Sequence, residues 1–129
     1  ALIKKMVDAK MGGKDEVVVW GTGKASREFL YVEDAAEGIL LATEKYNKPD
    51  PINLGSGKEI TIAELVSLIA KLAEYEGIIV WDNSKPDGQP RRRLDTSKAK
   101  REFEFKARTD FVEGLKRTID WYKKSMHYS

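Results

Sequence analysis

Only a few short runs of this sequence are apolar and β-branched, and segments with helical periodicity separate them. The clearest runs are residues 17–20 and 78–81, and weaker candidates lie at 27–32, 52–54 and 93–94. Such runs predict short strands. About three or four short strands are too few for a complete doubly wound domain, which needs a larger parallel sheet with helices on both faces. We therefore expect an α/β protein of small mixed type, a lobe that packs against another structure.

Between these runs, apolar residues recur at the spacing of amphipathic helices. The predicted helices span residues 1–11, 34–46, 61–72, 96–103 and 110–122. Asp34 and Glu37 have capping-box spacing at the start of the second helix, and Thr61 and Glu64 form a clear capping box at the start of the third. In the last helix Trp121 is predicted to pack. The expected lobe thus has a few short strands and four to five helices.

The composition narrows the possible classes of function. The 129 residues suit one domain, or one lobe of a larger enzyme. The sequence has no cysteine and a single histidine, His127, which excludes a disulfide scaffold, a thiolate metal site and a cysteine nucleophile, so we expect no metal site. The formal charge of +2 argues against a nucleic-acid partner. No run approaches the roughly 20 apolar residues of a membrane span. Without a visible secretory signal, we expect no membrane partner and a cytoplasmic location.

Two glycine-rich turns suggest a nucleotide site, but each lacks a required part. Residues 21–26 open as Gly-x-Gly, yet Ser26 replaces the third glycine and no helix is predicted to follow. A dinucleotide turn needs that helix N-terminus to hold the pyrophosphate. Residues 55–58 are similar to the end of a phosphate-binding loop, but Glu59 stands where the magnesium ligand Ser or Thr is required. We therefore expect no cofactor site on this chain.

The segment 82–95 combines a Pro-Asp-Gly turn with three consecutive arginines at 91–93. One interpretation is a surface turn followed by a solvated basic run. The other is a phosphate or diphosphate clamp, because guanidinium groups bind phosphate oxygens in pairs and keep their charge. Asp87 would then accept hydrogen bonds from sugar or base groups. A nucleic-acid patch is a third interpretation, although these arginines lack an aromatic stacking platform.

Trp20 and Arg27 bracket the first glycine turn. They are either a core aromatic residue and a surface charge, or the aromatic wall and phosphate-binding residue of a cleft. The pattern alone leaves both interpretations open.

Three segments, residues 17–34, 52–65 and 84–95, resemble signature motifs of the GDP-L-fucose synthase family of extended short-chain dehydrogenases/reductases. That family makes GDP-fucose from GDP-4-keto-6-deoxymannose with NADP. The resemblance implies that residues 1–129 are a single C-terminal substrate-binding domain, a fragment of a two-domain enzyme. It places the Rossmann domain, with the NADP turn and the catalytic Ser, Tyr, Lys, Cys and His, outside this chain. We therefore expect no catalytic residue here and no activity of the chain alone.

The resemblance also assigns substrate contacts. They would be Lys5, Trp20, Arg27, Asp87 and Arg92, the last in place of a lysine. Arg27 and Arg92 would bind the diphosphate and Asp87 the nucleoside, while Trp20 and Lys5 would line the cleft. The implied partners are a nucleotide sugar and the N-terminal Rossmann domain, in an enzyme that is a homodimer.

The sequence departs from the family pattern at residues 102–105, where the family has a glycine followed by an aromatic residue. This departure leaves open that the chain is the substrate lobe of another UDP- or dTDP-sugar epimerase or dehydratase. A separate alternative is a stand-alone binding module without enzymatic activity.

Overall fold

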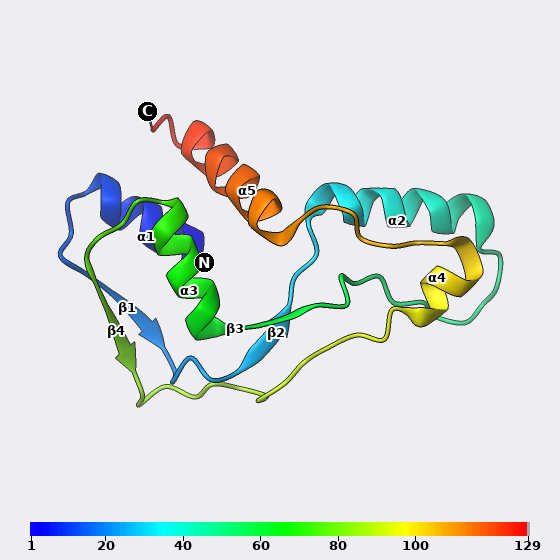
Figure 1. The fold of residues 1–129 in the computed structure, drawn as a ribbon, viewed down its shortest axis with the longest axis horizontal. Helices are drawn as coiled ribbons and strands as arrows, with labels where there is room; N and C mark the ends of the chain where they lie inside the picture. Colours follow the sequence, from blue (N-terminus) through cyan, green and yellow to red (C-terminus); the bar gives the residue numbers. More distant parts are fainter. Residues whose placement is uncertain (129) are drawn as a thin grey trace.

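The computed structural model describes residues 1–128, which form five helices and four strands (Figure 1). In chain order these are α1 (Leu2–Met11), β1 (Glu16–Trp20), β2 (Ser26–Glu28), α2 (Val32–Lys45), β3 (Glu59–Thr61), α3 (Ile62–Leu72), β4 (Ile78–Asp82), α4 (Ser97–Phe103) and α5 (Phe111–Ser125). The small mixed α/β class with few strands is confirmed.

The strands form two separate pairs. β1 and β4 are parallel, with Glu16 opposite Ile78 and Trp20 opposite Asp82. β2 and β3 are antiparallel, with Ser26 opposite Thr61. Because β1 and β4 run in the same direction, both end at the same edge and the loops that follow them emerge side by side. The carboxyl ends of parallel strands are the usual position of ligand sites in α/β folds.

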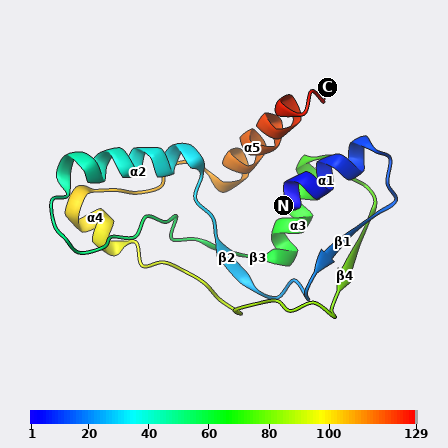
Figure 2. The same ribbon diagram turned by 180° about the vertical axis from the view of Figure 1, so that it is seen from behind.

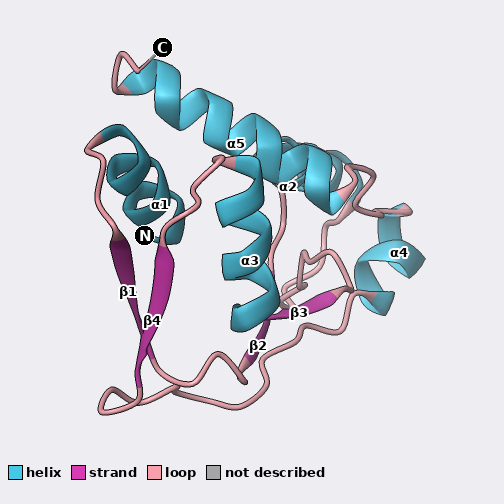
Figure 3. Ribbon diagram, turned by 60° about the vertical axis from the view of Figure 1, so that its left-hand side comes forward, coloured by secondary structure: helices cyan, strands magenta, loops and turns pink. Residues whose placement is uncertain are grey.

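The main core lies between the β1–β4 pair and three helices (Figure 3). Its most completely buried large side chains are Met6, Val7, Val66, Ile69 and Ile119. Along β1, Val17 and Val19 face this core, whereas Val18 and Trp20 are exposed. This alternation of period two gives the strand one buried face. It directs Trp20 outward at the end of the strand.

A second, smaller cluster lies where α2 and α4 extend away from the main core (Figure 2). Its buried residues are Ala99, Phe103 and Phe105, with Ile52 and Leu54 among the residues packed on them. This cluster joins α2, α4 and the extended segments between them into a thin layer. β2 and β3 connect that layer to the main core.

The strand predicted at 52–54 is wrong. Ile52 and Leu54 alternate with the exposed Asn53 as a strand would, but within residues 1–128 no neighbouring strand pairs with them. The strand of this region is β3 instead. The strand predicted at 93–94 is also wrong, since the backbone makes a single bridge between Ser26 and Arg91. A strand needs a partner, which local sequence does not reveal.

Two helix predictions also need correction. α2 begins at Val32, and the cap residue Tyr31 makes no side-chain capping bond. Asp34 instead turns into the protein and is buried. Trp121 on α5 is 66% exposed, so the prediction that it packs is wrong. The capping box of the third helix is confirmed, because the Thr61 hydroxyl accepts a hydrogen bond from the Glu64 amide.

Candidate functional site

The loops that follow β1 and β4 are fastened to each other from end to end. The Gly21 amide donates to the Asp82 carbonyl at 3.0 Å, and the Ser26 amide donates to the Pro90 carbonyl at 2.9 Å. Between these two points lie residues 21–25 of the first loop and 83–89 of the second. Figure 1 shows both loops below the β1–β4 pair. These two segments, which we call the paired loops, form the base of the candidate site.

Asp87 and Thr22 connect the centres of the two loops. The Asp87 carboxylate accepts a hydrogen bond from the Thr22 amide at 2.7 Å and from the Thr22 hydroxyl at 2.6 Å. These bonds, led by the one from the hydroxyl, hold the pKa of Asp87 below its ordinary value. Asp87 is therefore an ionised carboxylate bound to the neighbouring loop.

Arg27 reaches the second loop from β2. Its guanidinium donates to the Ser26 carbonyl at 2.7 Å, to the Gln89 carbonyl at 2.6 Å and to the Asp87 carbonyl at 3.3 Å. The structure thus brings two of the predicted residues, Arg27 and Asp87, together. The contact runs through backbone carbonyls, so Arg27 supports the loop as well as supplying positive charge.

Trp20, Lys5 and Lys85 form a second group at the end of β1. The Trp20 side chain is 63% exposed, which removes the interpretation that it belongs to the core. The ammonium groups of Lys5 and Lys85 lie 5.9 Å and 5.3 Å from the centre of the Trp20 ring, within the range of a cation–π contact. The Lys5 ammonium also donates to the Val18 carbonyl at 3.0 Å. An exposed aromatic face and two cations therefore lie together.

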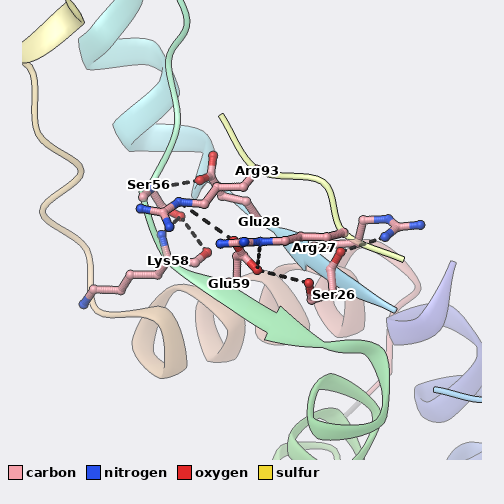
Figure 4. Close-up of polar contacts among 9 residues, drawn as sticks. Ser26, Arg27, Glu28, Ser56, Lys58, Glu59 and Arg93 are labelled. Carbon is pink, nitrogen blue, oxygen red and sulfur yellow. Dashed lines mark hydrogen bonds and ion pairs between the residues drawn. The ribbon is translucent and has the colours of Figure 1, made fainter. Parts of the chain in front are cut away.

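The arginine run does not act as one unit. Arg91 pairs with Glu59 at 2.7 Å, and Arg93 approaches the same carboxylate at 3.9 Å. Ser26 also donates to Glu59, which lies among these groups in Figure 4. The bonds from Arg91, together with Ser26, lower the pKa of Glu59. This carboxylate offsets much of the positive charge of the two arginines.

Arg92 lies between those two arginines and is exposed. Among residues 1–128 it takes part in no hydrogen bond or ion pair. The structure therefore does not join Arg92 to the other predicted contacts, although it leaves the guanidinium accessible to a ligand.

The Gly21–Gly23 turn does not fit a dinucleotide. It leads into β2, and the nearby start of α3 is already occupied by protein. The Ala63 amide donates to the Gly23 carbonyl and the Ile62 amide to the Ala25 carbonyl, both at 2.9 Å. A Cβ at Gly23 would lie 2.8 Å from the Trp81 ring, so a glycine is needed for this close packing. The turn positions the candidate site and offers no helix N-terminus to a pyrophosphate.

Two residues of the site were missed in the sequence. Thr22 stands between two glycines and Lys85 precedes the Pro-Asp-Gly turn. Lys85 could have been predicted from the sequence, because a positive charge beside a turn at the end of a strand suits an anionic ligand. Nothing in the local sequence around Thr22 indicates its bond to a residue 65 positions later.

Other features of residues 1–128 add no second candidate site. A small pocket lies elsewhere, lined by residues such as Gly55, Thr96 and Phe105, and none of the predicted contacts lines it. Residues 1–128 hold no group of three or more side chains suited to bind a metal ion. Within the same range no helix is long and apolar enough to cross a membrane.

Comparison with known proteins identifies the relatives of this chain. Residues 1–55 match the model of the NAD dependent epimerase/dehydratase family. Over 126 residues the chain is 42% identical to a probable GDP-L-fucose synthase 1 from Oryza sativa subsp. japonica, a match that covers 98% of the chain and 38% of that relative. Over this region the chain is similar to GDP-L-fucose synthases. The resemblance seen in the sequence motifs is confirmed.

Several solved structures share the fold. A GDP-L-fucose synthetase from Naegleria fowleri has a TM-score of 0.89 and 30% identity, over 98% of this chain and 39% of that one. Its structure bound to NADP gives a TM-score of 0.87. A UDP-glucose 4-epimerase from Thermotoga maritima, solved with UDP-glucose, has a TM-score of 0.83 and 27% identity, over 97% of this chain and 38% of that one. The chain spans about two fifths of the length of these relatives.

Proposed function

We propose that this chain is the nucleotide-sugar-binding, C-terminal domain of an NADP-dependent epimerase/reductase similar to GDP-L-fucose synthase. One observation carries the proposal. The exposed Trp20 ring lies beside the ammonium groups of Lys5 and Lys85. Together with the paired loops, these groups stand at the carboxyl ends of two parallel strands. This arrangement offers an aromatic face and cations to a ligand that is both aromatic and anionic, such as a nucleoside diphosphate.

The proposed roles follow from the contacts. Trp20 supplies a stacking or wall surface, and Lys5 and Lys85 supply ammonium groups for phosphate oxygens. Arg27 and Arg92 add guanidinium groups that suit a diphosphate. Binding energy from the nucleotide would then orient the sugar over catalytic groups on another domain. We expect the chain alone to bind nucleotide without turning over a substrate.

A separate NADP-binding domain is the partner that this proposal requires. The outward side of α2 supports such a partner, because Val32, Ile39 and Leu40 are 70%, 59% and 63% exposed. With Ala36 and Thr43 they follow helical spacing along one side of the helix. The Thr43 hydroxyl donates to the Ile39 carbonyl at 2.8 Å, so this stripe offers little free polarity. A 14-residue helix that buries only Asp34 and Gly38 against its own chain has a second face available for contact.

A different sugar nucleotide is the second candidate. The likeness to the UDP-glucose 4-epimerase supports a UDP-sugar enzyme. The identity to the rice relative favours a GDP-sugar. The base therefore has to be assigned by experiment.

The test is a titration of the isotope-labelled chain with GDP, UDP, dTDP and NADP in parallel, followed by backbone amide shifts. We expect GDP to shift the amides of Trp20, Arg27 and the non-proline residues between 85 and 92. Selective shifts with UDP or dTDP would assign the domain to another sugar-nucleotide enzyme. If no nucleotide produces shifts at millimolar concentration, the proposed site is wrong for this chain. Turnover of GDP-4-keto-6-deoxymannose with NADPH by the chain alone would contradict the two-domain proposal.

A further inference from the structure

The Asp87 carboxylate is already engaged within the chain. Both of its oxygens accept hydrogen bonds from Thr22, at 2.7 Å from the amide and 2.6 Å from the hydroxyl. A nucleotide group that used this carboxylate would compete with both bonds. Hydrogen bonds to a charged acceptor are stronger than those between neutral groups, so this competition has a cost. We call the pair Thr22 and Asp87 the latch.

Gly21, next to Thr22, leaves space for the Asp87 carboxylate because it has no side chain. A Cβ at this position would lie 2.2 Å from the Asp87 carboxylate oxygen, and the residue has a φ of +94°. The positive φ favours a glycine, because few other residues adopt this backbone conformation, and a side chain here would displace the Asp87 carboxylate from Thr22. The sequence next to Thr22 is therefore suited to the close approach of Asp87.

The same loop is held from its other side. Arg27 donates to the Asp87 and Gln89 carbonyls, so its guanidinium fastens the backbone while Thr22 fastens the side chain. Lys85 lies two residues before Asp87, and its amide donates to the Asp82 carbonyl at 3.2 Å. The loop between Asp82 and Gln89 is thus fixed at its start, at Asp87 and at its end.

We propose that Asp87 is a positioning residue, which holds the loop after β4 so that Lys85 stands over the Trp20 ring. In this assignment Lys85 and Trp20 touch the nucleotide, whereas Asp87 acts through Thr22. The assignment differs from the direct nucleoside contact implied by the family resemblance. Its consequence for ligand binding rests on the proposed function, but the latch itself is a property of the free chain.

The test is a double-mutant cycle on the whole 129-residue chain with Thr22→Val, Asp87→Ala and the double variant. Thr22→Ser is the matched control, because it keeps the hydroxyl. Hydrogen exchange of the Thr22 amide and the nuclear Overhauser contact between Lys85 and Trp20 report on the latch without ligand. GDP affinity reports on the site. Far-UV circular dichroism and exchange at Ile69 verify that each variant folds.

We expect Asp87→Ala to speed exchange of the Thr22 amide about tenfold and to remove the contact between Lys85 and Trp20. Thr22→Val should weaken GDP binding severalfold in the wild-type background and have no effect in the Asp87→Ala background. Thr22→Ser should resemble the wild type. Exchange of the Thr22 amide within twofold of wild type in folded Asp87→Ala would overturn the latch. A loss of affinity in Asp87→Ala with none in Thr22→Val would show a direct contact and overturn the positioning role. If wild type binds no nucleotide, the proposed function fails, while amide exchange still decides the latch.

Discussion

Asp34 on α2 and Thr109 before α5 are joined by two hydrogen bonds across 75 positions of sequence. The carboxylate accepts from the Thr109 amide at 3.1 Å and from the Thr109 hydroxyl at 3.0 Å. Asp34 is 6% exposed and is the one buried charged residue of the described chain, residues 1–128. This pair connects the α2–α4 layer to the start of the helix that packs on the main core.

Asp34→Ala is expected to destabilise the chain by about 1–3 kcal/mol, because it leaves the Thr109 amide without its partner in a region of low exposure. Thr109→Val, which keeps the amide bond and loses the hydroxyl bond, is expected to cost about 1 kcal/mol. The free energy of unfolding from urea titration measures both. A cost below about 0.5 kcal/mol for Asp34→Ala, the range of ordinary surface changes, would show that the pair does not stabilise the fold.

Lys85→Ala is expected to weaken binding of GDP about tenfold, since it removes one charged contact to the phosphates. Lys45→Ala is the control, because it removes a lysine at the far end of α2 and leaves the overall charge change the same. Isothermal calorimetry at two salt concentrations measures both variants. Equal affinities of the two variants would contradict a role for Lys85 at the site.

The latch is expected to depend on pH. The hydrogen bonds from Thr22 hold the pKa of Asp87 below its ordinary value of 3.8. The ionised carboxylate therefore stabilises the folded loop at pH values above 3.8. This stabilisation is lost as the pH falls below 3.8 through the lower pKa of the folded chain. The carboxyl carbon shift of Asp87 between about pH 2 and pH 6 measures the midpoint. In Thr22→Val the midpoint should rise toward the ordinary value. A wild-type midpoint at or above 3.8 would contradict the bonding described.

The exposed stripe of α2 is expected to tolerate charge in the isolated chain but not in an assembled enzyme. Ile39→Lys should change the free energy of unfolding by less than about 0.5 kcal/mol, because the side chain is exposed. The binding partner in this test is the remainder of the rice relative, the residues that this chain does not match, expressed as a separate protein. Ile39→Lys should prevent association with it. Ser67→Lys introduces the same residue at an exposed position of α3, away from the stripe, and should associate normally. Association by both variants would show that the stripe is not the contact surface.

Local pattern predicted the elements whose signals lie within a few residues. The β-branched runs of β1 and β4, the helical periodicity of α5 and the Thr61–Glu64 capping box each specify structure through neighbours in sequence. The errors share one cause. Residues 52–54 have the alternation of a strand but no partner within residues 1–128, and Asp34 has the spacing of a cap but binds Thr109 instead.

The sequence by itself determined the fold class, the two central strands, the absence of cysteine and the family resemblance. Only the tertiary structure decided which residues meet. It placed Lys85 over Trp20, turned Asp87 toward Thr22 and set Glu59 against Arg91. The physical reason is the range of the interactions. Propensity and capping act within one or two turns of chain. These contacts join segments that only the parallel pairing of β1 with β4 and the antiparallel pairing of β2 with β3 bring together.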